Sequence, residues 1–242
     1  MPLSLSLDDP RWFLDSLTEH VLQPLDTAST TLAREQCELE TERDALESFR
    51  TRVEGIDTES HSQRQMPRTT EPRATTGTDT ARAAYRRTFF AIDHQEDVYG
   101  ETLIESIAEE FGADFAAALQ PDSNVQFSPQ FKQALLSTAE KSIHERESLI
   151  GCIETEQRSV ERATETLSSI LETLDSSVIP AWYRGQFEAE LDEVLDARQR
   201  TLNDRTQSFD NHDFCAYLYD DAVWTYPVLT SVARLRESVA MD

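Results

Sequence analysis

The sequence has little glycine, cysteine or lysine and no long apolar run. Six glycines in 242 residues are too few for an all-β fold, which needs a turn about every 8–12 residues. No uncharged apolar run reaches the roughly 18 residues that a transmembrane helix requires, so we expect no membrane association. The first residues lack the basic start and apolar stretch of a signal peptide. Three cysteines at distant positions match no disulfide or zinc pattern, so we expect a reducing cytoplasm.

The charge balance is strongly acidic. The chain has 46 acidic residues against 22 basic ones, for a net charge of −24, and only Lys132 and Lys141 are lysines. Carboxylates hold hydration water, whereas an exposed lysine stem adds apolar area that strong salt drives to associate. We therefore predict the cytoplasm of a salt-accumulating halophile. The acidity is interpreted as solvation and not as a metal site or a mimic of nucleic acid.

Apolar residues at seven-residue steps predict two long helices. The first helix starts near Pro10 or Leu25 and ends near Gly55. Its row is interrupted at the companion positions by Glu35 and Glu42. Such a row needs a facing helix, and we expect that helix in the same chain, with a homotypic coiled coil as the alternative. The row consists of Leu25, Leu32, Leu39, Leu46 and Val53.

The second long helix is expected from Ser128-Pro129 to about Asp175, since proline suits the first helical position. The best apolar row of the chain lies in its later part, and Glu156 is the one defect in it. That row consists of Leu149, Ile153, Val160, Ala163, Leu167, Ile170 and Leu174.

We divide the chain into four parts. Residues 1–56 form the N-terminal long helix, and residues 57–80, with seven threonines and no apolar period, form a flexible linker. Residues 81–127 form a short acidic helical subdomain, with Asp79 capping its first helix and one helix expected to reach Phe115. Residues 128–242 form a long helical hairpin and an aromatic-rich C-terminal cap. Within this part, another amphipathic helix is indicated by Phe187, Leu191, Val194, Leu195 and Leu202, and Pro227 opens a final short helix. The fold class is all-α: long antiparallel helices in a bundle with coiled-coil character.

One basic cluster is a candidate phosphate-binding surface. Arg82, Arg86 and Arg87 lie on one expected helix, with the first two on the same face at i,i+4. This cluster carries our alternative function, a nucleic-acid-associated regulator. The acidic body repels a polyanion, and binding by counterion release weakens steeply with salt. We therefore do not expect nucleic acid as the partner.

Aromatic residues gather near the C-terminus, with six of them between Phe209 and Tyr226. One interpretation is a hydrophobic plug that closes the end of the bundle. The other is a partner-binding patch, because tyrosine and tryptophan dominate interface hot spots. The patch candidates are Tyr217, Tyr219, Trp224 and Tyr226.

The same segment carries a family resemblance. Tyr217-Leu218-Tyr219, followed by the Trp-Thr-Tyr-Pro-Val-Leu run that starts at Trp224, resembles the end of an uncharacterised family of haloarchaeal proteins. Tyr85-Arg86 and Tyr99-Gly100-Glu101 resemble the middle of that family. The family is a domain of unknown function, so the resemblance implies a halophilic origin and no catalytic residues.

No catalytic, phosphate-cradling or metal-binding motif occurs in the sequence. We therefore expect no enzyme, no cofactor and no metal, and the leading function is a helical interaction or scaffold module. Its protein partner is not identified by the sequence, and both monomer and homodimer remain open.

Overall fold

The computed structural model describes residues 10–58, 76–92, 102–176, 184–205 and 211–240, and these residues contain helices and no strand. This confirms the all-α prediction. The central part of the predicted linker, residues 59–75, lies outside the described residues, as do residues 93–101. No described helix is long and apolar enough to cross a membrane.

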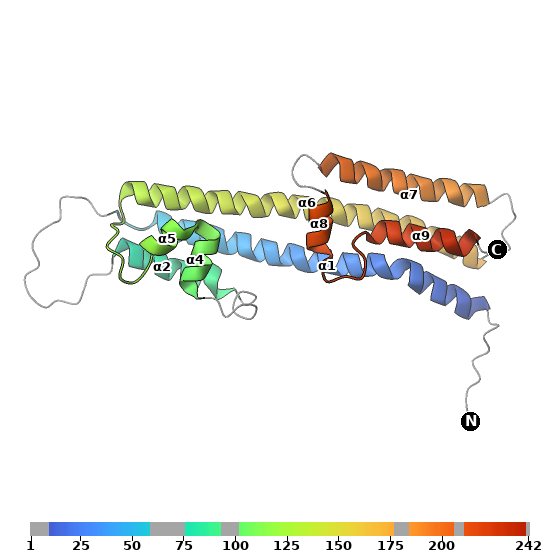
Figure 1. Ribbon diagram of the computed structural model, residues 1–242, viewed down its shortest axis with the longest axis horizontal. Coiled ribbons are helices and arrows are strands. Elements are labelled where there is room, and N and C mark those ends of the chain that lie inside the picture. The colour runs from blue at the N-terminus through green and yellow to red at the C-terminus, as the bar shows by residue number, and fades with distance from the viewer. Residues whose placement is uncertain (1–9, 59–75, 93–101, 177–183, 206–210, 241–242) are drawn as a thin grey trace, which may run out of the picture. The chain divides into compact units, whose positions relative to one another are not determined.

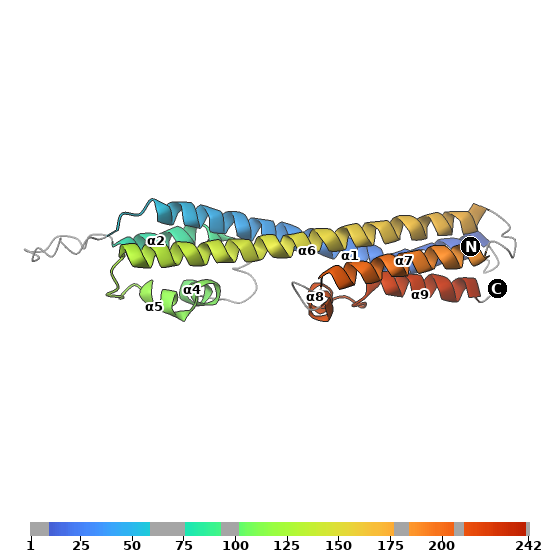
Figure 2. The same ribbon diagram turned by 90° about the horizontal axis from the view of Figure 1, so that it is seen from above.

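The chain forms two compact units. Unit 1 comprises Met1–Gln36 and Gly151–Asp242, and unit 2 comprises Cys37–Ile150. Two long helices, α1 (Pro10–Glu54, 45 residues) and α6 (Pro129–Ser176, 48 residues), contribute to both units. In each unit these two helices run in opposite directions, as predicted (Figures 1 and 2).

The predicted leucine row of α1 is buried by the chain itself. All five of its members are at most 7% exposed. On α6, Ile153, Val160, Ala163, Leu167 and Ile170 are buried as expected, whereas Leu149 and Leu174 at the two ends are half-buried. Neither row is therefore left exposed as a zipper surface.

The start of α6 and the end of α1 meet through capping interactions. Ser128 Oγ accepts a hydrogen bond from the Phe131 amide at 3.1 Å, which confirms the predicted helix start. Lys132 Nζ donates to the backbone oxygens of Glu54 at 2.7 Å and Ile56 at 2.8 Å. A cation at this place satisfies carbonyls that the last turn of α1 leaves without helical partners.

Among its described residues, unit 2 adds three short helices and a 3-10 turn: α2 (Gly77–Arg87), η2 (Phe89–Ala91), α4 (Leu103–Phe111) and α5 (Ala113–Ala118). The N-cap of α2 is Thr76, and Asp79 is the third helical residue of a capping box, so the prediction of Asp79 as the cap is wrong by three positions. The Thr76 hydroxyl is the main group that lowers the pKa of Asp79. The single helix expected up to Phe115 is interrupted at Gly112, whose φ of +95° favours glycine.

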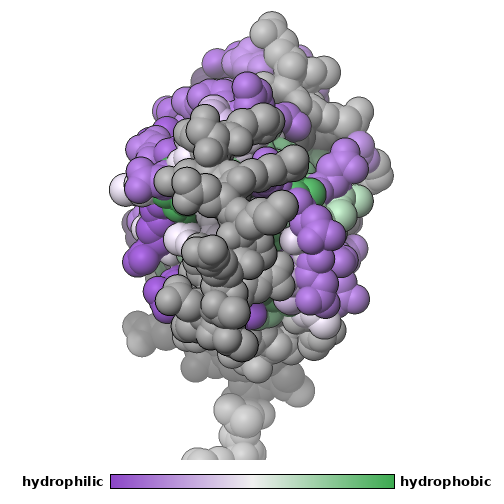
Figure 3. Space-filling model, turned by 90° about the vertical axis from the view of Figure 1, so that its left-hand side faces the viewer, coloured by the Kyte–Doolittle hydropathy of each residue, from purple (hydrophilic) through white to green (hydrophobic). Residues whose placement is uncertain are grey.

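Aromatic rings fill the core of unit 2. Phe49 of α1 lies 5.5 Å from Tyr85 and 5.3 Å from Phe111, measured between ring centroids. Tyr85 is fully buried, and its hydroxyl is 2.9 Å from Ser106 Oγ. The residue that carried part of the family resemblance is therefore a core residue. Seen from the end in Figure 3, the described surface is mostly hydrophilic.

Unit 1 contains α7 (Arg184–Arg205), α8 (Asn211–Leu218) and α9 (Pro227–Ala240). Pro227 opens the last helix, as predicted. α7 and α9 run along the long helices, while α8 runs across them (Figures 1 and 2). The hydroxyl of Tyr217 on α8 donates to Glu35 of α1.

Candidate functional site

A buried ion pair joins α6 and α7 in unit 1. Arg198 donates from Nη1 to one carboxylate oxygen of Glu156 at 2.7 Å and from Nη2 to the other at 2.9 Å. The side chains are 2% and 0% exposed. A buried charge is tolerated only when it is paired and hydrogen-bonded, and the bidentate geometry meets both needs.

The position of each partner follows from the apolar rows. Glu156 is the defect that the sequence shows in the α6 row. On α7, Phe187, Leu191 and Val194 are buried at steps of four and three, and Arg198 takes the next place at a step of four. The row was expected to continue through Leu195 and Leu202 instead, and both are only half-buried. The one charged residue in the apolar row of α6 therefore pairs with the one charged residue in the apolar row of α7.

Two residues of α8 and its C-terminal end complete this network. Tyr219 is 2% exposed, and its hydroxyl donates to Glu156 at 3.1 Å. Arg198 Nη2 lies 3.9 Å from the sulfur of the buried Cys215. Burial and then the Glu156 carboxylate raise the pKa of Tyr219 far above its usual value. Burial lowers the pKa of Arg198, but Glu156, followed by Cys215 and Tyr219, raises it, and the net change is upward.

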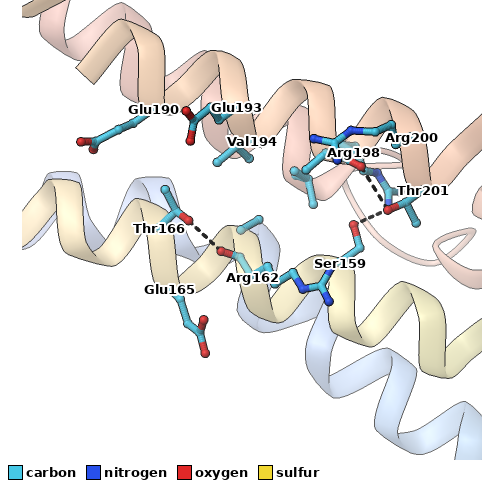
Figure 4. Close-up of a pocket in the computed structure, with 13 residues that line it drawn as sticks. Ser159, Arg162, Glu165, Thr166, Glu190, Glu193, Val194, Arg198, Arg200 and Thr201 are labelled. Atoms are coloured by element: carbon cyan, nitrogen blue, oxygen red, sulfur yellow. Dashed lines mark hydrogen bonds between the residues drawn. The ribbon is translucent and has the colours of Figure 1, made fainter. Parts of the chain in front are cut away.

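A groove of about 530 Å³ opens beside this pair between α6 and α7. Its floor contains Ala163, Val194, Arg198 and Val228, all buried. Charged side chains stand on its sides (Figure 4). The Ser159 hydroxyl accepts from Arg198 at 3.3 Å at one end. The groove thus has a closed, charge-balanced base and polar walls.

The four aromatic candidates of the C-terminal segment do not share one environment. Tyr217 is 52% exposed, and Trp224 and Tyr226 are half-buried. Arg234 stacks over the Trp224 ring at 4.7 Å from its centroid. Tyr219 belongs to the buried network. The plug interpretation therefore fits Tyr219, which is buried, whereas partner binding by the other three residues stays a prediction.

Exposed apolar side chains extend this segment. Four large hydrophobic residues are exposed in the described part of the chain. Three of them, Tyr217, Val223 and Leu229, fall within residues 217–229, which we name the exposed apolar segment. Val223 is 82% exposed. Val223 and Leu229 were not predicted as site residues, because an isolated valine or leucine in a sequence carries no sign of exposure.

The three arginines of the basic cluster differ in their contacts. Arg82 forms an ion pair with Asp79 at 2.6 Å and donates to the Leu119 backbone oxygen at 3.0 Å. The contact with Leu119 holds α2 against the end of α5. Arg86 and Arg87 are exposed. Two of the three arginines thus face solvent, and the third has a structural role.

A second ion-pair network lies in unit 2. Arg146 of α6 binds Glu110 of α4 with two hydrogen bonds, at 2.6 and 2.9 Å, and Glu42 of α1 with one at 3.1 Å. Its guanidinium also lies 5.7 Å from the Phe89 ring centroid. Glu42, which interrupts the sequence pattern of α1, is therefore half-buried and paired.

No group of three or more side chains suited to a metal ion occurs among the described residues.

Comparison with known proteins identifies a family. Neither a curated protein nor a solved structure matches the chain. A family model described as a domain of unknown function, DUF7260, matches residues 23–242. This confirms the predicted membership of a family of unknown function, while the haloarchaeal origin stays a prediction. The chain belongs to the DUF7260 family.

Proposed function

We propose that this protein is a non-enzymatic helical interaction module that binds a protein partner through the exposed apolar segment. The observation that carries this proposal is the concentration of exposed apolar side chains at Tyr217, Val223 and Leu229. Exposed apolar side chains that gather in one region are typical of interaction sites, whereas scattered ones need no explanation.

The anchoring of this segment supports the proposal. The hydroxyl of Tyr217 donates to Glu35, and Trp224 is stacked against Arg234. Arg234 also donates to the backbone oxygen of His20 at 2.5 Å. A surface held in this way loses less conformational freedom when a partner binds.

The location is part of the same proposal. The composition, with 46 acidic residues and two lysines, supports the cytoplasm of a salt-accumulating cell. Association through apolar contacts suits that setting, since strong salt screens charge attraction and strengthens apolar burial.

The alternative, a nucleic-acid-associated regulator, depends on Arg86 and Arg87, which are exposed at the end of α2. Titration of labelled DNA and RNA at molar KCl distinguishes the two functions. Sequence-selective binding that is lost on replacing the exposed Arg86 and Arg87 would establish the alternative.

The test of the main proposal is affinity purification from native lysate at molar KCl. The bait is the wild-type chain or the double variant Val223→Ser, Leu229→Ser. Val125→Ser is the matched control, because Val125 is the fourth exposed hydrophobic and lies in unit 2. We expect proteins retained by the wild type and by the control to be lost with the double variant, with helicity unchanged. Equal retention by all three baits would refute the proposal.

A further inference from the structure

α7 carries a second regular row besides its buried one. Glu190, Glu193, Ala197 and Arg200 follow one another at steps of three, four and three, and all four line the groove between α6 and α7. Glu193 and Arg200 are exposed, and Glu190 and Ala197 are half-buried. A row at this spacing forms a continuous stripe that another helix can cover.

Opposite charges occupy the two ends of this stripe. Because α6 and α7 are antiparallel, Glu165 of α6 comes to the same end as Glu190 and Glu193 (Figure 4). Arg200 lies at the other end, and the Arg162 side chain extends toward that end from α6. Seven residues separate Glu193 from Arg200, which is about 10 Å along a helix. The groove therefore has an acidic end and a basic end, with the small Ala197 midway.

This pattern is complementary to itself. A two-fold axis through Ala197 would turn a second copy so that its α7 runs antiparallel to the first. Glu193 of each copy would then face Arg200 of the other, and both contacts would be ion pairs. The small side chain of Ala197 would meet its own equivalent on the axis and allow a close approach of the helices.

We propose that the groove between α6 and α7 is the contact surface for a second copy of this chain, with α7 of each copy lying antiparallel in the groove of the other. The same rotation brings the acidic end of each α7 near Arg162 and its basic end near Glu165. A parallel arrangement would set like charges against each other. Charge complementarity thus selects both the partner and its direction.

The dimer is weak in dilute buffer and stronger in concentrated salt. Exposed ion pairs contribute little each, about 0.2–1 kcal/mol, so they select the arrangement more than they stabilise it. The net charge of −24 per chain opposes association until salt screens it.

Charge reversal tests the proposal by light scattering of the full chain at high protein concentration in molar KCl. We expect a wild-type mass of twice 27.5 kDa. Glu193→Arg and Arg200→Glu should each raise the dimer dissociation constant by about threefold or more, since both contacts become like-charge pairs. A mixture of the two variants should recover the dimer, because one variant carries arginine at both of these positions of the stripe and the other carries glutamate at both.

The mixture also controls for folding, since misfolded variants could not restore each other. Glu188→Arg is the matched control: it is an exposed glutamate of the same helix outside the groove, and this variant should dimerise like the wild type. A wild-type mass of 27.5 kDa at all concentrations, a dimer indifferent to both reversals, or a mixture that stays monomeric would each overturn the proposal.

Discussion

Arg198 and Glu156 form a bidentate ion pair in which both side chains are at most 2% exposed. The pair joins the apolar rows of α6 and α7 at the one place where each row carries a charge. Taking two charges out of water offsets much of their attraction, so such a pair adds little net stability over apolar residues of similar volume. Its main effect is on alignment, because only one register of α7 against α6 brings the two charges together.

The first prediction separates alignment from stability. In a Tyr219→Phe background, which removes the hydroxyl that would lose its acceptor, Glu156→Leu or Arg198→Met alone should lower the free energy of unfolding by about 3–5 kcal/mol. The double variant should return to within about 1–2 kcal/mol of the background, since no buried charge remains. Urea unfolding at molar KCl, followed by circular dichroism, measures this coupling. Additive losses in the double variant would show that the charges do not act as a pair.

Local patterns were sufficient for most of the helices. The seven-residue rows predicted α1 and α6, Ser128-Pro129 predicted the start of α6, and Pro227 predicted the start of α9. The break at Gly112 was missed, because nothing in the apolar pattern requires a positive φ there. The cap of α2 was misplaced for a related reason: Thr76 and Asp79 are both good capping residues, and only the backbone conformation decides between them.

The buried network shows what the sequence could not predict. Glu156 was visible as a defect, and a charge in an apolar row implies a buried partner. Arg198 was overlooked because Leu195 and Leu202 offered an apolar continuation of the α7 row. Whether Arg198 or the two leucines lie on the buried face of α7 depends on the register between α6 and α7. Neither helix specifies that register alone. Tyr219 was grouped with Tyr217 by composition, although they are two residues apart and face different surroundings.

The second prediction concerns alkaline pH and Tyr219. Burial and Glu156 raise the pKa of Tyr219 in the folded state, so the folded protein keeps this hydroxyl protonated. An unfolded tyrosine ionises near pH 10, so above that pH the unfolded state binds fewer protons. The contribution of Tyr219 to stability is therefore present below pH 10 and is lost as the pH rises further, by about 1.4 kcal/mol per pH unit.

The Tyr219→Phe variant should lack this loss of stability. The other tyrosines are present in both proteins, so their ionisation does not affect the difference between the two free energies of unfolding. We expect the stability difference between wild type and variant to shrink between about pH 10 and 11. Urea unfolding at several pH values measures it, and a difference independent of pH would contradict the assignment.

The third prediction uses the only two lysines of the chain. Lys132 bonds two backbone oxygens at the end of α1, whereas Lys141 pairs with Glu145 in an exposed i,i+4 contact at 3.2 Å. Lys132→Met should lower the free energy of unfolding by about 1–2 kcal/mol, since it removes charged hydrogen bonds to terminal carbonyls. Lys141→Met is the matched control and should change it by less than about 0.5 kcal/mol. Similar losses for both variants would mean that the cap contributes no more than a surface pair.

The fourth prediction concerns salt. The chain carries 24 surplus negative charges, and in dilute buffer the Debye length of about 10 Å at 0.1 M lets them repel one another. Raising KCl to about 2 M reduces that length to roughly 3 Å or less and strengthens apolar burial. Helicity and melting temperature should therefore rise markedly across this range. The buried Glu156–Arg198 pair is shielded from salt by the protein, so the double replacement of these residues should show the same rise. Thermal melts followed by circular dichroism test both statements. A melting temperature independent of KCl would count against the halophilic interpretation of the acidity, because repulsion between surface carboxylates would then be too small to limit the fold.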